Sequence, residues 1–304
     1  MADFKLLNFE RNKGEVRPGL LVDNDQIIDI QNATGDEKWC TSTLNILREW
    51  HQACPVLHKM AEGLTDKVSL SDVKLLAPIL YPPAIYCAGA NYKKHAMEMS
   101  ADKKTFPDKK ITNPYFFLKS GPHCVIGPDE AIRLPAISNC VDWEAEFAVV
   151  IGKAGRNISV DNAFDYVAGY TIMNDLSARD HSKRDDWPRW GVDWFGHKNF
   201  DGAAPLGPWI TPADQIDDPY KCQMKLWVNE EEMQNEFVSD LIFDIAEQIE
   251  WISRRLTLLP GDVISTGTPS GVGRPRGIFL KPGDTVRINI DGIGELRNTV
   301  VQGE

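Results

Sequence analysis

Alternating hydrophobic and polar positions divide the chain into two parts. In the N-terminal part, short apolar runs at residues 4–9, 20–22 and 26–30 predict strands, and the pattern of residues 42–62 predicts a helix. The adjacent prolines Pro82 and Pro83 mark a boundary shortly afterwards. We therefore expect a small N-terminal α/β domain, residues 1–75, and a larger domain, residues 76–304.

The larger part is predicted to be mainly β-structure. Its short apolar or alternating runs, bounded by Gly, Pro, Asn or Asp, lie at residues 85–89, 114–120, 144–152, 166–175, 221–229, 262–267 and 285–291. These strands do not alternate regularly with helices, as a doubly wound sheet requires. The expected fold is therefore α+β, mainly β, and rolled or barrel-like.

One helix is predicted clearly within this β-rich part. Asp244 and Glu247 have the spacing of a capping box. Ile245, Ile249, Ile252 and Leu256 follow as one apolar stripe. We interpret the stripe as a packing surface without a chemical role.

Composition excludes several classes of function. The chain has 304 residues, 42% of them hydrophobic, and 33 Lys and Arg against 44 Asp and Glu, a formal charge of −11. A chain with this balance lacks the basic surface that binds a phosphate backbone, so we expect no nucleic-acid partner. The 6 cysteines show no C-x-x-C and no regular spacing, which argues against both a zinc site and a disulfide framework.

The hydropathy pattern also argues against a membrane protein. No uncharged apolar run approaches the roughly 18 residues that span a bilayer, and the N-terminal residues lack an apolar signal-peptide region. A reducing cytoplasm is the expected compartment.

Three acidic residues form the candidate metal site. Glu144 and Glu146 lie two apart in a predicted strand, so their side chains share one face. Asp175 ends the next apolar run. Three oxygen donors suit Mg²⁺ or Mn²⁺, and Ca²⁺ could occupy the site without being the working ion. The alternative is an exposed edge strand with its acids in solvent and a turn aspartate.

A histidine and a glutamate form the candidate acid–base pair. His95 and Glu98 lie three apart in a segment of helical character, so the two side chains can form a hydrogen bond. A carboxylate beside imidazole fixes its tautomer and raises its basicity. The alternative is a surface histidine beside a surface glutamate.

Three motifs extend this picture. They are DWEAEFAVVIG at 142–152, AGYTIMNDLSARD at 168–180 and GDVISTGTPSGVG at 261–273. With them, the chain from about residue 78 onward resembles the fumarylacetoacetate hydrolase superfamily, in its acylpyruvase and 2-hydroxyhepta-2,4-diene-1,7-dioate isomerase-like branch. The resemblance implies a mixed β-sandwich roll, a homodimer, and a divalent metal on Glu144, Glu146 and Asp175.

The resemblance also implies roles for other residues. It makes His95 and Glu98 the catalytic pair, in a segment that acts as a lid over bound substrate. It places Arg179 and Lys198 at the substrate carboxylate and developing negative charge, and the Thr268 hydroxyl in contact with the substrate. Lys119 is either structural or directed toward the pocket.

Two positions depart from the pattern of the superfamily. Ala90 stands where many relatives carry a basic residue, and Ser182 stands where many carry a glutamine that helps to polarise the carbonyl or orient water. His181 or His197 is a candidate replacement for that polar group. Between them, the aromatic-rich segment 187–195 is either a hydrophobic plug or dimer surface, or a wall of the pocket.

The leading functional hypothesis is metal-dependent hydrolysis of a C–C bond in an acylpyruvate or related β-diketo acid, through a pyruvate enolate. Decarboxylation of a β-keto acid such as oxaloacetate, or isomerisation or dehydration of a keto acid, is the alternative, because the glutamine is missing at Ser182. A third hypothesis is a metal-containing protein that binds keto acids without catalysis.

Overall fold

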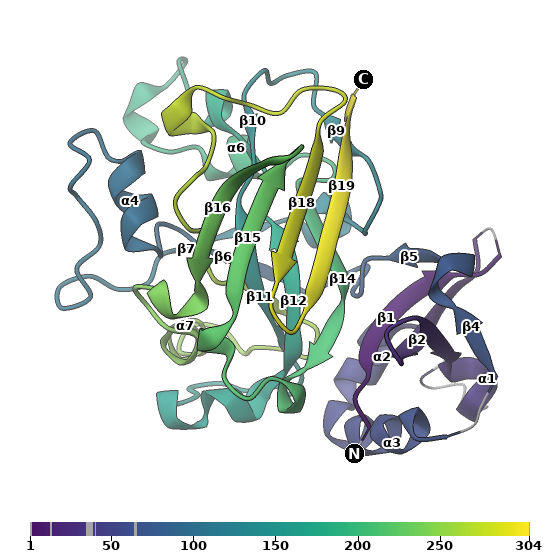
Figure 1. The fold of residues 1–304 in the computed structure, drawn as a ribbon. Coiled ribbons are helices and arrows are strands. Elements are labelled where there is room, and N and C mark those ends of the chain that lie inside the picture. The colour runs from purple at the N-terminus through teal and green to yellow at the C-terminus, as the bar shows by residue number, and fades with distance from the viewer. Residues whose placement is uncertain (1, 13, 35–38, 40, 64–65, 304) are drawn as a thin grey trace.

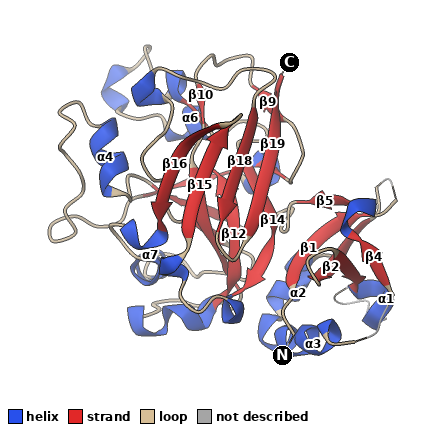
Figure 2. Ribbon diagram, viewed as in Figure 1, coloured by secondary structure: helices blue, strands red, loops and turns tan. Residues whose placement is uncertain are grey.

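Two β-sheets dominate the computed structural model, which describes residues 2–12, 14–34, 39, 41–63 and 66–303 (Figures 1 and 2). The strands are β1 Lys5–Glu10, β2 Val16–Val22, β3 Gln26–Asp29, β4 Lys67–Ser69, β5 Lys74–Leu76, β6 Ile85–Ala88, β7 Phe116–Lys119, β8 Val125–Ile126, β9 Ile132–Leu134, β10 Val141–Asp142, β11 Ala145–Ile151, β12 Val167–Asn174, β13 Ser177–Ala178, β14 Ala204–Pro212, β15 Gln223–Val228, β16 Glu231–Phe237, β17 Val263–Ser265, β18 Thr285–Ile290 and β19 Gly294–Gln302. The α-helices are α1 Ile30–Thr34, α2 Thr43–Arg48, α3 Trp50–Ala61, α4 Lys93–Met99, α5 Gly121–Cys124, α6 Trp194–Lys198 and α7 Ile245–Ser253.

The two sheets form a mixed sandwich. The larger has the order β4-β3-β2-β1-β14-β12-β11-β17-β6-β7, and the smaller has the order β16-β15-β18-β19-β9. Strand β17 pairs with β6 in parallel, while β11 pairs with both β12 and β17 antiparallel. In Figure 1 the smaller sheet lies in front of β11 and β12. The predicted α+β, mainly β fold is confirmed.

The N-terminal strands continue the larger sheet. Strand β1 pairs with β5, and Leu6 on β1 is in register with Ile210 on β14. Helices α2 and α3 lie below strands β1 and β2 in Figure 1, and their buried side chains share a core with the larger sheet. The expected boundary at residue 75 falls inside β5 and stays a prediction.

Strand β11 is buried along its whole length. Its residues Phe147, Val149 and Ile151 pack in the core that contains the smaller sheet. Ala148 and Val150 point the other way, into a second core that includes side chains of α2 and α3. The charges of Glu144 and Glu146, at the start of this strand, therefore lie beside an apolar interior.

Every strand predicted from the hydrophobic pattern is present, but some strands were missed. Strand β14 contains Pro205, Pro208 and Pro212, and prolines argue against strand assignment because they lack an N–H donor. Strand β19 alternates buried positions with exposed ones, and its many polar residues weaken the hydrophobic signal.

The helices differ from the prediction in two places. The segment 42–62 breaks at Glu49, whose φ of −123° and ψ of 24° are not helical, so that α2 and α3 replace a single helix. The capping box of Asp244 and Glu247 is present at α7. That helix ends at Ser253, however, so Leu256 lies beyond the stripe and is exposed.

The cysteines and the helices bear on the expected absence of disulfides and of membrane spans. Among them, Cys54, Cys87, Cys124, Cys140 and Cys222 are free thiols, while Cys40 lies outside the described part. Within the same ranges, no helix is long and apolar enough to cross a membrane.

Candidate active site

The antiparallel pairing of β11 and β12 brings three carboxylates together. Ala145 is in register with Asn174, so Glu144 and Glu146 meet Asp175 where the two strands end. One ligand oxygen from each lies within 4.8 Å of the others. The three residues, here called the carboxylate triad, are at most 4% exposed. The alternative of solvent-exposed acids is therefore wrong.

Basic side chains surround the triad. The Lys198 ammonium lies 2.6 Å from Glu144 Oε2 and 2.7 Å from Asp175 Oδ2. Lys119 Nζ lies 3.0 Å from Asp175 Oδ1. Arg179 donates from Nε to Asp142 at 2.8 Å and from Nη2 to Glu144 at 2.5 Å. Glu144 and Asp175 are thus both paired with cations.

Glu146 differs from the other two acids of the triad. Among the described residues, no Lys or Arg forms an ion pair with it; its Oε2 accepts from the Ser265 hydroxyl at 2.5 Å and from the Gly267 amide at 2.9 Å. Gly267 has φ +111°, and an added Cβ would lie 2.8 Å from Asn91 Cβ, so glycine is required for this close approach.

The electrostatics of the triad favour an added cation. Burial, with the charges of Asp175 and Glu144, raises the pKa of Glu146 well above its usual range. Burial would also raise the pKa of Glu144, but Lys198 and Arg179 outweigh it and hold that pKa well below the usual range. The buried acids, including Asp142, number four against three basic groups, so ionising all four, Glu146 among them, leaves one negative charge unbalanced. This arrangement fits a divalent metal with oxygen ligands.

Helix α4 holds the candidate acid–base pair. His95 Nδ1 lies 3.0 Å from Glu98 Oε1, and the Glu98 carboxylate also accepts from the Gly271 amide at 3.0 and 3.1 Å. The side chain of His95 is buried. The contact with Glu98 occupies Nδ1, so Nε2 remains for a ligand. The alternative of a surface pair is wrong.

A cavity of about 700 Å³ joins these groups. Its wall includes His95, Glu144, Glu146, Arg179, Lys198 and Thr268. Residues of α4 and of the following segment, among them Met99, Phe106 and Asn113, form another part of the wall. The segment therefore occupies the position expected of a lid, and its movement stays a prediction.

The residues predicted to contact substrate differ in whether their polar groups already have partners in the protein. The Thr268 hydroxyl oxygen accepts from Gln234 Nε2 at 2.9 Å, which leaves its O–H to donate to a ligand. Arg179 already binds Asp142 and Glu144. In the geometry observed, Arg179 orients Glu144, and its predicted contact with substrate is not tested.

Comparison with known proteins shows to which family the chain belongs. The family model described as fumarylacetoacetate (FAA) hydrolase, C-terminal, matches residues 84–301. The chain belongs to the fumarylacetoacetate hydrolase family. Its relative oxaloacetate tautomerase YisK from Bacillus subtilis is 37% identical over 300 residues, 93% of this chain and 95% of that protein.

Two solved structures of the family are also similar. Maleylpyruvate hydrolase from Sphingobium sp. SYK-6, in complex with manganese and pyruvate, is 32% identical with a TM-score of 0.78, covering 99% of this chain and 100% of that one. A 2-hydroxyhepta-2,4-diene-1,7-dioate isomerase from Mycobacterium marinum is 32% identical with a TM-score of 0.71, covering 98% of both chains. By their names, these relatives catalyse more than one type of reaction, namely tautomerisation, hydrolysis and isomerisation.

The segment after Asp175 shows how this member of the fumarylacetoacetate hydrolase family departs from the glutamine pattern. The Ser182 hydroxyl donates to the Arg179 carbonyl at 2.8 Å. His181 Nε2 lies 2.5 Å from the Ile137 carbonyl. His197 lines the cavity, its Nδ1 lies 2.8 Å from the Asp193 carbonyl, and burial together with Lys198 lowers its pKa to about 4. Of the two histidines, His197 is the one that lines the cavity, and its Nε2 can accept a hydrogen bond but has no N–H to replace the donor of a glutamine.

The aromatic segment divides between two roles. Trp194 lines the cavity and stacks on Phe117 with ring centroids 4.7 Å apart. Trp187 and Phe195 are exposed instead. The pocket-wall interpretation holds for Trp194, whereas Trp187 and Phe195 remain available to another surface.

Sequence reasoning missed two residues that support the triad. Asp142, which binds Arg179 and accepts from the Gly273 amide, precedes Glu144 and Glu146 in one D-x-E-x-E pattern, and this alternation is a signal that was available. Gln234, which accepts from the Ala145 amide, lies on the other sheet, and no local motif identifies it.

Lys119 is structural as well as electrostatic. Its ammonium donates to the carbonyls of Leu176 at 2.9 Å, Lys198 at 2.6 Å and Ala203 at 2.8 Å, and it lies against Asp175. Removing one partner from such a buried group is costly. Lys119→Met is expected to lower the free energy of unfolding by about 3–5 kcal/mol in denaturant titrations. Exposed Lys281→Met is the control, and equal stability of the two variants would contradict this role.

Proposed function

We propose that the chain interconverts the keto and enol forms of a small 2-keto diacid such as oxaloacetate, with Mg²⁺ or Mn²⁺ bound by the carboxylate triad. The tautomerase from Bacillus subtilis supports this assignment, because it aligns with 93% of this chain. The manganese and pyruvate bound by the Sphingobium hydrolase support both the metal and the 2-keto acid.

The acidic and basic groups suit such a substrate. A divalent metal on the triad would supply a Lewis acid that polarises a keto oxygen. Lys198 and the O–H of Thr268 line the same cavity and suit anionic oxygens. Neutral His197 donates from Nδ1 to the Asp193 carbonyl, so its Nε2 can accept a hydrogen bond from a protonated group of the substrate.

His95 supplies the proton transfer. In the keto-to-enol direction, Nε2 takes a proton from the carbon beside the keto group, the keto oxygen gains one from water, and the imidazolium gives its extra proton back to water. The reverse reaction returns both protons. Glu98 accepts a hydrogen bond from the Nδ1–H group, with a separation of 3.0 Å, and this leaves the Nε2 lone pair free to take the proton.

One observation favours tautomerisation over hydrolysis. The His95–Glu98 pair shares its cavity with the triad, while the Ser182 hydroxyl is directed to the Arg179 carbonyl. At position 182, therefore, no side-chain amide is present to orient an attacking water. Proton transfer to and from carbon needs the base but no bound water.

Hydrolysis of an acylpyruvate is the second candidate. The same imidazole could deprotonate water, and the Sphingobium hydrolase aligns with 99% of this chain at a TM-score of 0.78. Decarboxylation of oxaloacetate would use the same site but release CO₂ and pyruvate.

These reactions can be separated on one preparation. With Mg²⁺ or Mn²⁺, the full chain is expected to accelerate the equilibration of enol and keto oxaloacetate by about 10²-fold or more over buffer, measured by stopped-flow ultraviolet absorbance. Pyruvate formation and acylpyruvate cleavage are followed in parallel by chromatography. Equilibration at the buffer rate, with conversion of acylpyruvate to two acids, would instead assign the hydrolase.

A further inference from the structure

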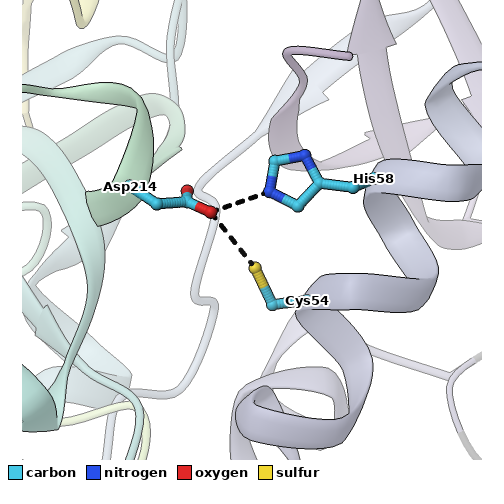
Figure 3. A group of neighbouring side chains, drawn as sticks. All are labelled: Cys54, His58 and Asp214. Atoms are coloured by element: carbon cyan, nitrogen blue, oxygen red, sulfur yellow. Dashed lines mark hydrogen bonds and ion pairs between the residues drawn. The ribbon is translucent and has the colours of Figure 1, made fainter. Parts of the chain in front are cut away.

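A second cavity lies away from the active site. It has a volume of about 720 Å³ and lies where α3 of the N-terminal unit meets the segments around η2, Val160–Tyr166, and η5, Ala213–Gln215. Its lining shares no residue with the cavity of the triad. Cys54, His58 and Asp214 lie on its wall, with their side chains directed toward one another (Figure 3).

These three side chains come from two parts of the chain. Cys54 and His58 are four residues apart on α3 and therefore share one helix face. Asp214 follows β14 of the larger sheet. One sulfur, one nitrogen and one oxygen atom from the three lie within 4.8 Å of one another.

The hydrogen bonding of His58 places a proton or a cation beside Asp214. Its Nδ1 lies 2.8 Å from the Ala2 carbonyl, which can only accept, so Nδ1 carries a proton. Its Nε2 lies 2.8 Å from Asp214 Oδ2. In the neutral ring, the Nε2 lone pair would face a carboxylate. A proton between them removes that repulsion at the observed separation, and a metal ion would do so once the two atoms move apart by roughly 0.5 Å. A backbone carbonyl on Nδ1 is also how metal-binding histidines are commonly oriented.

A catalytic Cys–His–Asp arrangement does not explain the cluster. The Cys54 sulfur contacts Asp214 Oδ2 at 4.0 Å, and His58 Nε2 is engaged by the same carboxylate. Burial, with the charge of Asp214, raises the pKa of the Cys54 thiol to about 12. Within the part of the chain that the structure describes, neither His58 nor Asp214 is therefore placed to activate the thiol as a nucleophile.

We propose that Cys54, His58 and Asp214 bind a zinc ion that joins α3 to the end of β14. Thiolate, imidazole and carboxylate are the protein ligands of Zn²⁺, whereas Mg²⁺ prefers oxygen alone. Zinc–ligand bonds place tetrahedral ligand atoms roughly 3.3–3.8 Å apart, and the observed separations of 2.8 and 4.0 Å lie on either side. The proton of the thiol is released to solvent, and the fourth ligand position faces the cavity.

The pattern of cysteines along the sequence does not reveal this site. Zinc motifs are recognised by closely spaced cysteines and histidines. Here Asp214 is 160 residues from Cys54, and only the fold brings the two together.

The full chain tests this directly with Co²⁺ as a spectroscopic substitute for zinc. Excess Mg²⁺ occupies the carboxylate triad, and Co²⁺ is then titrated. We expect about one Co²⁺ per chain at this site with a thiolate-to-cobalt charge-transfer band, absent in Cys54→Ser and weakened in Asp214→Asn. Zn²⁺ is expected to displace the cobalt and to raise the Tm of the native chain by about 5 °C at saturation.

Two variants make the outcome specific. Cys140→Ser removes a half-buried thiol elsewhere and is expected to leave the band unchanged. Glu146→Gln removes an acid of the triad and is likewise expected to retain the band. The proposal is overturned by a native chain without the band, by a band that persists in Cys54→Ser, or by loss of the band in Glu146→Gln.

Discussion

Glu146→Gln is expected to abolish divalent-metal binding at the carboxylate triad and to lower turnover of the preferred keto acid by about 10³-fold or more. Glutamine keeps an oxygen for the Ser265 hydroxyl and the Gly267 amide, which Glu146 Oε2 now binds at 2.5 and 2.9 Å. It removes the one triad charge that lacks a basic partner among the described residues. Calorimetric titration with Mn²⁺ and steady-state kinetics measure the two losses.

The stability of the metal-free protein distinguishes this effect from misfolding. Burial and the neighbouring acids Asp175 and Glu144 disfavour an ionised Glu146. Without metal, the neutral variant is therefore expected to unfold at the same temperature as the native chain or at a higher one. Glu231→Gln, an exposed acid on β16, is the matched control and should change neither metal binding nor turnover. Full activity of Glu146→Gln after chelator treatment would contradict the assignment of the triad.

Metal binding also has to displace existing contacts. The Lys198 ammonium lies between Glu144 and Asp175, at 2.6 and 2.7 Å. A metal that binds all three acids competes for those same oxygens. Lys198 can then turn its charge to an anionic substrate, which links occupancy of the triad to substrate binding.

The sequence predicted those parts of the fold that local pattern determines. The apolar runs of β11 and β12 are buried on both faces, and their hydrophobic signal is strong. The capping box at Asp244 works through residues three apart, so it too is local. Strand β14 was missed because its prolines are tolerated only by the pairing that the rest of the sheet provides.

The same distinction applies to the site. Glu144 and Glu146 could be recognised because strand geometry places them on one face, and Asp175 because it ends the neighbouring run. Gln234 could not, since it reaches the Ala145 amide from the smaller sheet. The partners of Lys119 are backbone carbonyls from three distant residues, and a carbonyl carries no sequence signal. The supporting contacts of the site thus depend on tertiary packing.

His95→Asn is expected to lower kcat by about 10²–10⁴-fold while leaving Mn²⁺ affinity unchanged. Asparagine retains a polar group in the cavity but cannot take a proton, and His95 is not one of the triad acids. Rapid-mixing measurements of oxaloacetate equilibration and Mn²⁺ titration of the same preparation separate proton transfer from metal binding.

Glu98→Gln changes the group that contacts Nδ1 of the same imidazole. Glu98 Oε1 lies 3.0 Å from Nδ1 and also accepts from the Gly271 amide at 3.0 Å, so a glutamine oxygen in its place keeps both contacts but carries no negative charge. Without the carboxylate charge, the imidazolium that forms when His95 takes a proton is less stabilised, and kcat should fall by about 10²-fold with an altered pH profile. Lys94→Ala, exposed on the same helix, controls for effects on α4 itself. Unchanged pH profiles in both Glu98→Gln and His95→Asn would place the proton transfer on another group in the cavity.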